Sequence, residues 1–434
     1  MMTPSIPAGF MELLPEDQIR MNTMKNIITR TFEKYAFLPL DTPVIEKSDV
    51  LLAKGGGETE KQIYRFTKGS NDLSLRFDLT VPLARYVAQH QNELSFPFRR
   101  YQIGKVYRGE RAQKGRFREF YQCDIDIIGS ENLSILNHAE IPAVIAEIFC
   151  AMGFEEFVFH VNNRKILNGL FRSLGVEEPA LVLRAVDKLD KIGREGVEKE
   201  LTDLGMSAEK QGELFDFLAI DGSNAEVLEA LRAFSCADET YRLGVEELST
   251  VLDGMAAFGV AEKNMKIDLS IARGLDYYTG TVFETFLTGY ESMGSICSGG
   301  SYDDLASHYS KKKLPGVGIS IGLTRLYTQL EEAGLFRFPV ENHLEVLVLP
   351  FPATMEAGIK LVQTLRNEGI IAQIYLESGK MGKKFTYADK LQAPYVVVVG
   401  ESELQEGKYM LRDMATGDQT AMTLDELTTK LKAD

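Results

Sequence analysis

A run of basic side chains between residues 99 and 118 is the part of the sequence best suited to binding a charged ligand. It reads RRYQIGKVYRGERAQKGRFR, and Glu110 is its only acidic residue, although the whole chain carries a formal net charge of −15. A charge run is most often a solvated surface, but the Gln-Lys-Gly-Arg loop inside this one favours a hairpin that binds phosphate. Phe120 follows, and its ring would either join the core or stack on a purine base. The basic residues are Arg99, Arg100, Lys105, Arg108, Arg111, Lys114, Arg116 and Arg118.

Two segments in which apolar and polar residues alternate lie on either side of this run. SLRFDLT (74–80) and YQCDIDII (121–128) each predict a strand with one apolar and one polar face. A half-exposed antiparallel sheet produces this pattern without any ligand. Two such faces beside a basic hairpin nevertheless indicate a pocket for a ligand that carries both an amine and phosphates. The polar faces hold Arg76, Asp78 and Thr80 in the first segment, and Gln122, Asp124 and Asp126 in the second.

Two further motifs come from the second half of the chain. Adjacent tyrosines in RGLDYYTG (273–280) would point to opposite faces of an extended strand, one to the core and one to a ligand. GVGISIGLTR (316–325) predicts a buried strand that runs into a helix, with Arg325 in its first turn. Helix N-termini attract anions, so a triphosphate would suit this position. The chain has no GxxxxGK[ST] motif, so any ATP would be bound in another way.

Several predicted elements position these residues. The spacing of apolar residues predicts an amphipathic helix over 17–37, followed by a short strand-like stretch between two prolines. Residues 165–262 have a charged helical texture and predict a helical insertion into a larger domain that spans 1–336. Gly334 would end the helix that holds Arg325. After a linker near 337–343, a β-α-β rhythm predicts a small α/β domain with a mostly parallel sheet over 343–434.

Composition excludes several classes of protein. Hydrophobic residues make up 44% and charged residues 26%, which is typical of a globular protein rather than a disordered or fibrous one. The four cysteines and five histidines are scattered, which argues against a disulfide framework, a zinc ribbon or another metal site built by the protein alone. No signal peptide and no membrane-spanning segment is evident. We therefore expect a cytoplasmic protein without a membrane partner.

Taken in order, these segments resemble the signature motifs of class II aminoacyl-tRNA synthetases. LPLDTPVIE resembles the first, dimer-forming motif; VYRGE, the Gln-Lys-Gly loop and RFREF resemble the second; GLTRL resembles the third. RGLDYYTGTVFE and GGSYDDLA are similar to segments peculiar to the histidyl-tRNA synthetase family. The resemblance runs from Gly9 to the C-terminal helix. It implies an α+β class II core, an antiparallel sheet flanked by helices with a helical insertion, and a C-terminal α/β anticodon-binding domain.

The resemblance also implies a role for each matching residue. Arg108 would contact the α-phosphate of ATP and the substrate carboxylate, and Arg325 the γ-phosphate. Glu110 would contact adenine, on which Phe120 would stack. Arg273 would lie opposite Arg108 across the reacting phosphorus and would also contact the histidine, which makes Arg108, Arg273 and Arg325 the catalytic set. The amino group of histidine would be held by Asp78, Thr80 and Gln122, and its imidazole by Asp126 and Tyr278, with Tyr277 lining the pocket.

The implied activity is ATP-dependent ligation of L-histidine to tRNA(His) through a histidyl-adenylate, with Mg²⁺ accompanying ATP and a homodimer as the working unit. One departure stands out, because Ser301 replaces the arginine that the family usually has in Gly-Gly-Arg-Tyr-Asp; the other arginines remain, so we expect activity to persist. The main alternative is a non-catalytic, histidine-binding paralogue, the regulatory subunit of ATP phosphoribosyltransferase. Such paralogues typically lose phosphate-binding arginines and the anticodon domain. A class II ligase for proline or threonine, and a bare nucleotide-binding module, fit the motifs less well.

Overall fold

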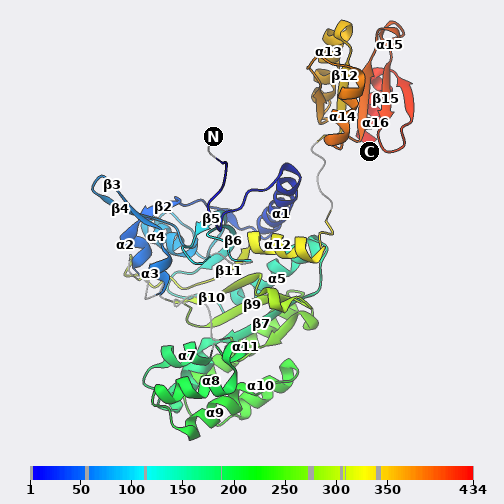
Figure 1. Ribbon diagram of the computed structural model, residues 1–434. Coiled ribbons are helices and arrows are strands. Elements are labelled where there is room, and N and C mark those ends of the chain that lie inside the picture. Colours follow the sequence, from blue (N-terminus) through cyan, green and yellow to red (C-terminus); the bar gives the residue numbers. More distant parts are fainter. Residues whose placement is uncertain are drawn as a thin grey trace. The chain divides into compact units, whose positions relative to one another are not determined.

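The computed structural model describes residues 3–53, 58–111, 115–186, 188–271, 278–303, 306–307, 309–338 and 344–433. The chain divides into two compact units, Met1–Phe338 and Pro339–Asp434, and each is described by itself (Figure 1). The predicted linker near 337–343 lies at this division, although residues 339–343 are outside the described part.

The described strands of the N-terminal unit are centred on an eight-stranded sheet with the order β1-β5-β6-β11-β10-β9-β7-β8. Neighbouring strands are antiparallel except for the pairs β1–β5 and β7–β8, which are parallel. The predicted α+β class with an antiparallel sheet is therefore confirmed. The bounds in sheet order are Leu38–Pro39, Phe98–Tyr107, Glu119–Ile128, Gly316–Gly322, Cys297–Tyr302, Thr281–Leu287, Phe157–Asn163 and Met265–Ile267.

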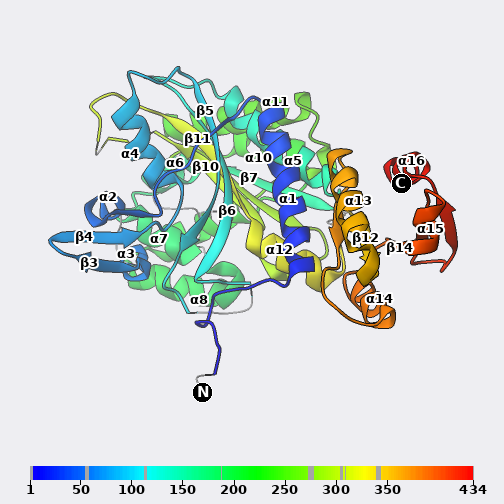
Figure 2. The same ribbon diagram turned by 90° about the horizontal axis from the view of Figure 1, so that it is seen from above.

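Alternation along β6 gives this sheet one apolar and one polar face, as the sequence predicts. Cys123, Ile125 and Ile127 are fully buried in the main core of the unit. Three helices contribute to the same core, namely α1 (Pro15–Lys34), α5 (Leu136–Ala151) and α12 (Leu323–Ala333). Figure 2 shows them on one side of the sheet. The opposite face of β6 carries the polar side chains of Gln122, Asp124 and Asp126.

The ends of two helices can be compared with the sequence predictions. α12 ends before Gly334, whose φ of 66° is the left-handed conformation expected of a helix-ending glycine. α1 ends at Lys34, before the predicted residue 37, because Ala36 takes a positive φ of 58° that turns the chain away from the helix.

The predicted strand over residues 74–80 is wrong in its second half. β4 (Asn71–Leu75) ends early, and helix α4 (Thr80–His90) begins at the last residue of the segment. The backbone N–H of Val81 donates to Oδ1 of Asp78 at 3.0 Å, and Pro82 stands in the first turn, where proline is tolerated. The short alternation of apolar and polar residues is therefore not enough to make a strand here. The Asp78 carboxylate accepts a hydrogen bond from a backbone N–H at the start of α4, which stabilises the helix end.

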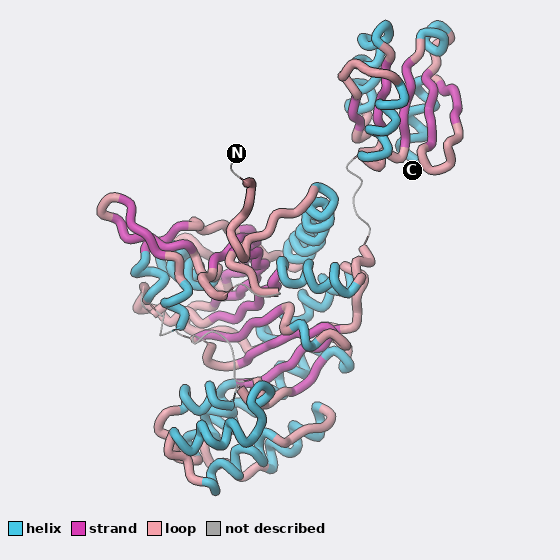
Figure 3. The backbone as a smooth tube through the Cα atoms, viewed as in Figure 1, coloured by secondary structure: helices cyan, strands magenta, loops and turns pink. Residues whose placement is uncertain are grey.

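Smaller elements complete the N-terminal unit. β4 pairs with β2 (Ile45–Lys47) and β3 (Arg65–Lys68) in a separate three-stranded sheet, with α2 (Ser48–Leu52) and α3 (Glu58–Gln62) nearby in the sequence. The predicted insertion consists of helices in its described part, which Figure 3 shows as one group. They are α6 (Arg164–Ser173), α7 (Pro179–Val186), α8 (Leu189–Asp203), α9 (Ala208–Leu218), α10 (Asn224–Ala233) and α11 (Glu239–Ala257).

The C-terminal unit is a five-stranded sheet with helices on both faces. Its order is β13-β12-β14-β15-β16; β13, β12 and β14 are parallel, whereas β15 and β16 are antiparallel. The prediction of a mostly parallel sheet therefore holds for one half only, because the two last strands form a hairpin. Two apolar clusters lie against the sheet, one with residues of α13 and α16 and one with residues of α14. The bounds are β12 Val346–Pro350, α13 Met355–Asn367, β13 Ala372–Ile374, α14 Met381–Lys390, β14 Tyr395–Val399, α15 Glu401–Gln405, β15 Tyr409–Asp413, β16 Gln419–Met422 and α16 Leu424–Ala433. None of the described helices of the chain has the length and apolar character that a membrane span requires.

Candidate active site

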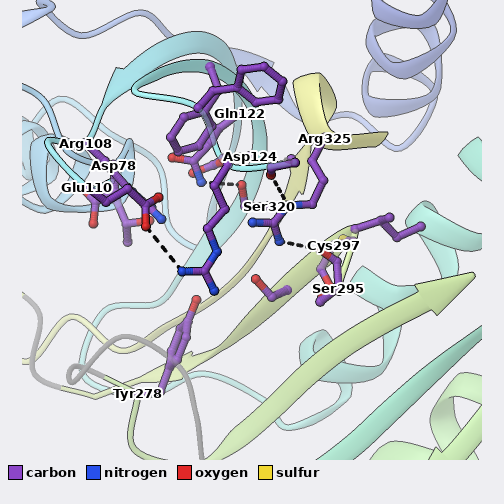
Figure 4. A pocket seen from close by; sticks show the side chains of 18 residues that line it. Asp78, Arg108, Glu110, Gln122, Asp124, Tyr278, Ser295, Cys297, Ser320 and Arg325 are labelled. Carbon is purple, nitrogen blue, oxygen red and sulfur yellow. Dashed lines mark hydrogen bonds and ion pairs between the residues drawn. The ribbon is translucent and has the colours of Figure 1, made fainter. Parts of the chain in front are cut away.

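A cavity of about 180 Å³ lies on the polar face of the eight-stranded sheet. Its floor is formed by β6, β11 and β10, and its walls by the β5–β6 hairpin, the turn before α4 and the start of α12. Figure 4 shows side chains from all these elements converging on it. Nearly all predicted site residues that the structure describes line this cavity, and they divide into a basic and an acidic part.

The basic part consists of arginines from two distant segments. Arg108 and Arg116 come from the hairpin, and Arg325 from the first turn of α12. Nε of Arg325 donates to the carbonyl of Gly115 at 3.1 Å, and Nη1 donates to the carbonyl of Ser295 at 2.9 Å. Burial, followed by the nearby charges of Arg116 and Arg108, lowers the pKa of Arg325. Three cations held this close favour a polyanionic ligand.

Aromatic rings border the basic part. The Arg108 guanidinium lies 4.4 Å from the ring centroid of Phe77 and 5.1 Å from that of Phe120. Phe117 lines the cavity beside Phe120. A half-buried ring next to a guanidinium provides a flat surface on which a base can stack. Glu110 lies at the same end, where Nη1 of Arg116 is 3.6 Å from its Oε2.

The acidic part is formed by the turn before α4 and by β6. Asp78 is almost fully buried, and burial is the main cause that raises the pKa of its carboxyl, with the charge of Arg108 acting in the opposite direction. Thr80 lies two residues further along, at the start of α4. On β6, Nε2 of Gln122 donates to Oγ of Ser320 at 2.8 Å, which fixes the amide while its oxygen has no donor among the described residues. These groups suit a ligand that donates hydrogen bonds.

Tyr278 also lines the cavity, and its position depends on a glycine. A Cβ on Gly300 would lie 2.9 Å from the Tyr278 ring and 2.7 Å from the carbonyl of Thr281, so only glycine leaves room there. The Tyr278 carbonyl accepts from Nη1 of Arg164 at 2.7 Å. The glycine pair in GGSY therefore serves the placement of the tyrosine as well as strand pairing.

Asp126 differs from the other predicted residues, because it does not line the cavity. Its carboxylate forms an ion pair with the fully buried Arg100 at 2.7 Å and accepts from the Tyr302 hydroxyl at 2.9 Å. Gly318 lies directly opposite on β11, and a Cβ there would collide with this carboxylate. Asp126 is thus deeper and more fully engaged than the strand pattern predicts. Its contact with the imidazole stays a prediction.

The basic run of residues 99–118 is not a single phosphate-binding surface. Arg99 pairs with Glu140 at 2.8 Å, Lys105 with Glu119 at 2.7 Å, and Arg118 donates to the carbonyl of Glu110 at 3.0 Å. Only Arg108 and Arg116 of its described members line the cavity. The other described basic residues of the run are directed away from the cavity by strand alternation or by pairing with neighbouring acidic groups. The net charge of the run does not distinguish these residues from Arg108 and Arg116.

Two predicted residues, Arg273 and Tyr277, lie outside the described residues, as does Lys114. Ser301, which departs from the family pattern, is buried and lines a separate cavity of about 220 Å³ together with His138 and Lys165. The position at which serine replaces the family's arginine therefore does not line the main cavity.

The strand alternation placed Asp124 on the polar face of the predicted pocket, and it lines the cavity, although the family resemblance gave it no individual role. Other lining residues were missed. Phe117, Ser298 and Ser320 line the cavity as well. Strand register brings three of the lining residues together, because Ser298, Ser320 and Asp124 are directly paired across β10, β11 and β6. Pairing between segments so far apart in sequence is not visible in a single sequence.

Among the described residues no group of three or more acidic, histidine or cysteine side chains could hold a metal ion.

Comparisons with known proteins agree with this arrangement. The family model described as "Histidyl-tRNA synthetase" matches residues 9–326, and the one described as "Anticodon binding domain" matches residues 345–434. "Histidine--tRNA ligase" of Clostridium tetani is 58% identical over 98% of this chain and 97% of its own, and that of Finegoldia magna is 50% identical over 100% of both. The crystal structure of histidyl-tRNA synthetase from Nostoc sp. PCC 7120 matches with a TM-score of 0.89, at 41% identity over 100% of both chains.

These matches do not favour the regulatory paralogue, because the anticodon-binding segment and the arginines at positions 108 and 325 are all present. Motifs, fold and relatives agree along the whole length of the protein, so the chain belongs to the histidyl-tRNA synthetase family.

Proposed function

We propose that the cavity on the sheet is where this histidine–tRNA ligase activates its amino acid before passing it to tRNA. The observation that carries the proposal is that one cavity has a basic part, lined by arginines, and an acidic part, lined by carboxylates. Arg108, Arg116 and Arg325 suit the phosphates of ATP, whereas Asp78 and the orphan oxygen of Gln122 suit the amino group of histidine. The ligand that needs both is an aminoacyl-adenylate.

The first step requires positioning and charge neutralisation rather than a side-chain nucleophile. A carboxylate oxygen of histidine attacks the α-phosphorus of ATP, the bond to the β-phosphate oxygen breaks, and pyrophosphate leaves. Arg108, stacked between Phe77 and Phe120, would hold the α-phosphate and the carboxylate. Arg325, anchored by two backbone carbonyls, would hold the γ-phosphate. Preorganised cations stabilise the charge of the transition state without reorganisation. Mg–ATP is the substrate form, since the metal neutralises the phosphates further.

In the second step a hydroxyl of the terminal adenosine of tRNA attacks the acyl carbon, and AMP leaves. The C-terminal unit would select the tRNA through its anticodon. Lys380, Lys383 and Lys390 of this unit are exposed and would contribute to contacts with phosphates. Lys384, which the sequence groups with them, is buried and donates to the carbonyl of Pro350 at 2.6 Å, so it supports the fold instead.

The direct test is ATP–pyrophosphate exchange with each amino acid supplied in turn. We expect exchange with histidine alone, and charging of tRNA(His) but not of other tRNAs. Exchange supported by proline or threonine would indicate another class II ligase. Histidine binding without exchange would indicate the regulatory paralogue.

Our proposal includes a homodimer in the cytoplasm. Leu38, Val44 and Ile45, in the segment that resembles the dimer-forming motif, are 58%, 38% and 46% exposed, and β1 is an edge strand. Exposed apolar side chains on an edge favour burial against a second copy. All four cysteines are free, in keeping with a reducing compartment. Light scattering would test the dimer, which Ile45→Asp should weaken.

A further inference from the structure

Asp124 is the buried carboxylate in the cavity to which the family resemblance gives no role. Its side chain is 3% exposed and lines the cavity from the middle of β6. Its Oδ1 has no hydrogen-bond donor among the described residues. A buried acceptor without a hydrogen-bond donor destabilises the protein, and more so when it is charged. A donor from a ligand would remove this destabilisation.

The neighbours of Asp124 leave one of its oxygens open. Ser320 is its partner on β11 and hydrogen-bonds to the carboxyl group. Gln102 is its partner on β5, but its amide donates to Asp41 at 2.9 Å and to Thr42 at 3.2 Å instead. Arg100 lies within electrostatic range of Asp124, yet its ion pair is with Asp126. The described residues therefore supply no hydrogen-bond donor to Oδ1.

A second orphan acceptor lies on the same strand face. Oε1 of Gln122 also lacks a described donor, and the two residues are separated by roughly 7 Å along the strand. Figure 4 shows both side chains beside Ser320 on the floor of the cavity. The nearby carboxylates of Asp78 and Asp126 add negative charge around Asp124, which the positive charge of Arg100 opposes. Two open acceptors close to these carboxylates fit a ligand that carries several N–H groups and a positive charge.

We propose that Asp124 contacts the amino-acid substrate directly, and that its open oxygen accepts a hydrogen bond from an N–H of histidine. The donor is either the α-ammonium group or the imidazole ring. Asp124 is then a specificity-determining residue in addition to those that the family resemblance assigns. This inference rests on the proposed function, since it takes histidine as the ligand of the cavity.

The test compares wild-type full-length protein with Asp124→Asn, which keeps the shape of the side chain but turns one acceptor into a donor. Glu119→Gln is the matched control, because Glu119 is on the same strand but lies outside the lining of this cavity. Pyrophosphate exchange is measured with histidine and ATP titrated separately. We expect Asp124→Asn to raise the KM for histidine about 10- to 100-fold, as for a hydrogen bond to a charged group, with less than a twofold change in the KM for ATP. Thermal melting verifies that each variant is folded, and Asp124→Ser is used if the asparagine variant is not.

Binding of two analogues identifies the donor. Imidazolepropionate lacks the amino group, and phenylalaninol lacks the imidazole. A penalty of Asp124→Asn that persists for imidazolepropionate assigns the contact to the imidazole, and one that persists for phenylalaninol assigns it to the ammonium group; either supports the inference. A folded variant with an unchanged KM for histidine, or with an equal rise in both KM values, overturns it. Absence of histidine-dependent exchange in the wild-type protein would instead overturn the proposed function.

Discussion

At the scale of single residues, the site is defined by like charges that the fold holds close together. Arg325 has its guanidinium anchored by backbone carbonyls and faces two other arginines. Asp124 has an open oxygen and faces two other carboxylates. Each arrangement is unfavourable in the empty protein and is relieved by a ligand of the opposite charge, which makes these residues the sharpest points at which to test the proposal.

For Arg325 we expect the substitution Arg325→Ala to slow pyrophosphate exchange by about 10²–10³, as for the loss of one preorganised transition-state donor. The KM for ATP should rise more than the KM for histidine, because the guanidinium faces the basic end of the cavity. Lys360→Ala, which removes an exposed cation paired only with Glu356, should leave exchange unchanged. A near-normal rate in the Arg325 variant would contradict the assignment to phosphate binding.

For Asp124 the pKa gives a pH prediction. Burial is the main cause that raises the pKa of this carboxyl to about 7; Asp126 and Asp78 act in the same direction, while Arg100 and the Ser320 hydroxyl oppose it. Near pH 7 the carboxyl of Asp124 is therefore protonated in part of the free protein. Binding of an N–H donor favours the carboxylate, so histidine binding should release this proton and strengthen as pH rises through 7.

Calorimetry in two buffers of different protonation enthalpy measures the released proton. The imidazole of histidine titrates in the same range, so the relevant quantity is the difference between wild type and Asp124→Asn, in which the carboxyl is absent. Equal proton release in the two proteins would contradict the prediction.

At the scale of secondary-structure elements, β5, β6 and β11 decide which carboxylate supports the fold and which meets the ligand. Asp126 is placed between Arg100 of β5 and Gly318 of β11, and forms a buried ion pair. We expect Asp126→Ala to destabilise the protein by about 3–5 kcal/mol, because it leaves the charge of Arg100 buried and uncompensated. Chemical denaturation measures this, and Asp72→Asn, which breaks an exposed pair, should have a much smaller effect. A stable Asp126→Ala protein with only a raised KM for histidine would instead make Asp126 purely a ligand contact.

At the scale of the whole molecule, the two units have separate cores, which suggests that activation and tRNA selection can be separated. Deleting residues 339–434 should spare pyrophosphate exchange far more than tRNA charging, because every described residue that lines the cavity belongs to the N-terminal unit. The truncated protein must be compared at matched stability and oligomeric state. Unchanged charging would show that the C-terminal unit does not select the tRNA.

The sequence by itself determined the features that depend on near neighbours. The alternation of YQCDIDII defined the polar face of β6, and the apolar spacing with Gly334 defined α12 and the place of Arg325 in its first turn. The motifs were also sufficient to identify the family and the class II fold, because they are strings of adjacent residues.

Only the tertiary structure decided how chemically equivalent residues divide their roles. Asp124 and Asp126 are the same residue type on the same strand face. Asp124 lines the cavity, however, whereas Asp126 forms a buried ion pair with Arg100. The difference arises from the residues opposite them on strands far away in sequence, which periodicity does not specify. The same holds for Lys384, which is buried by packing against β12 whereas its neighbour Lys383 is exposed. Periodicity determines the direction of a side chain, while burial and pairing with distant segments determine what it can bind.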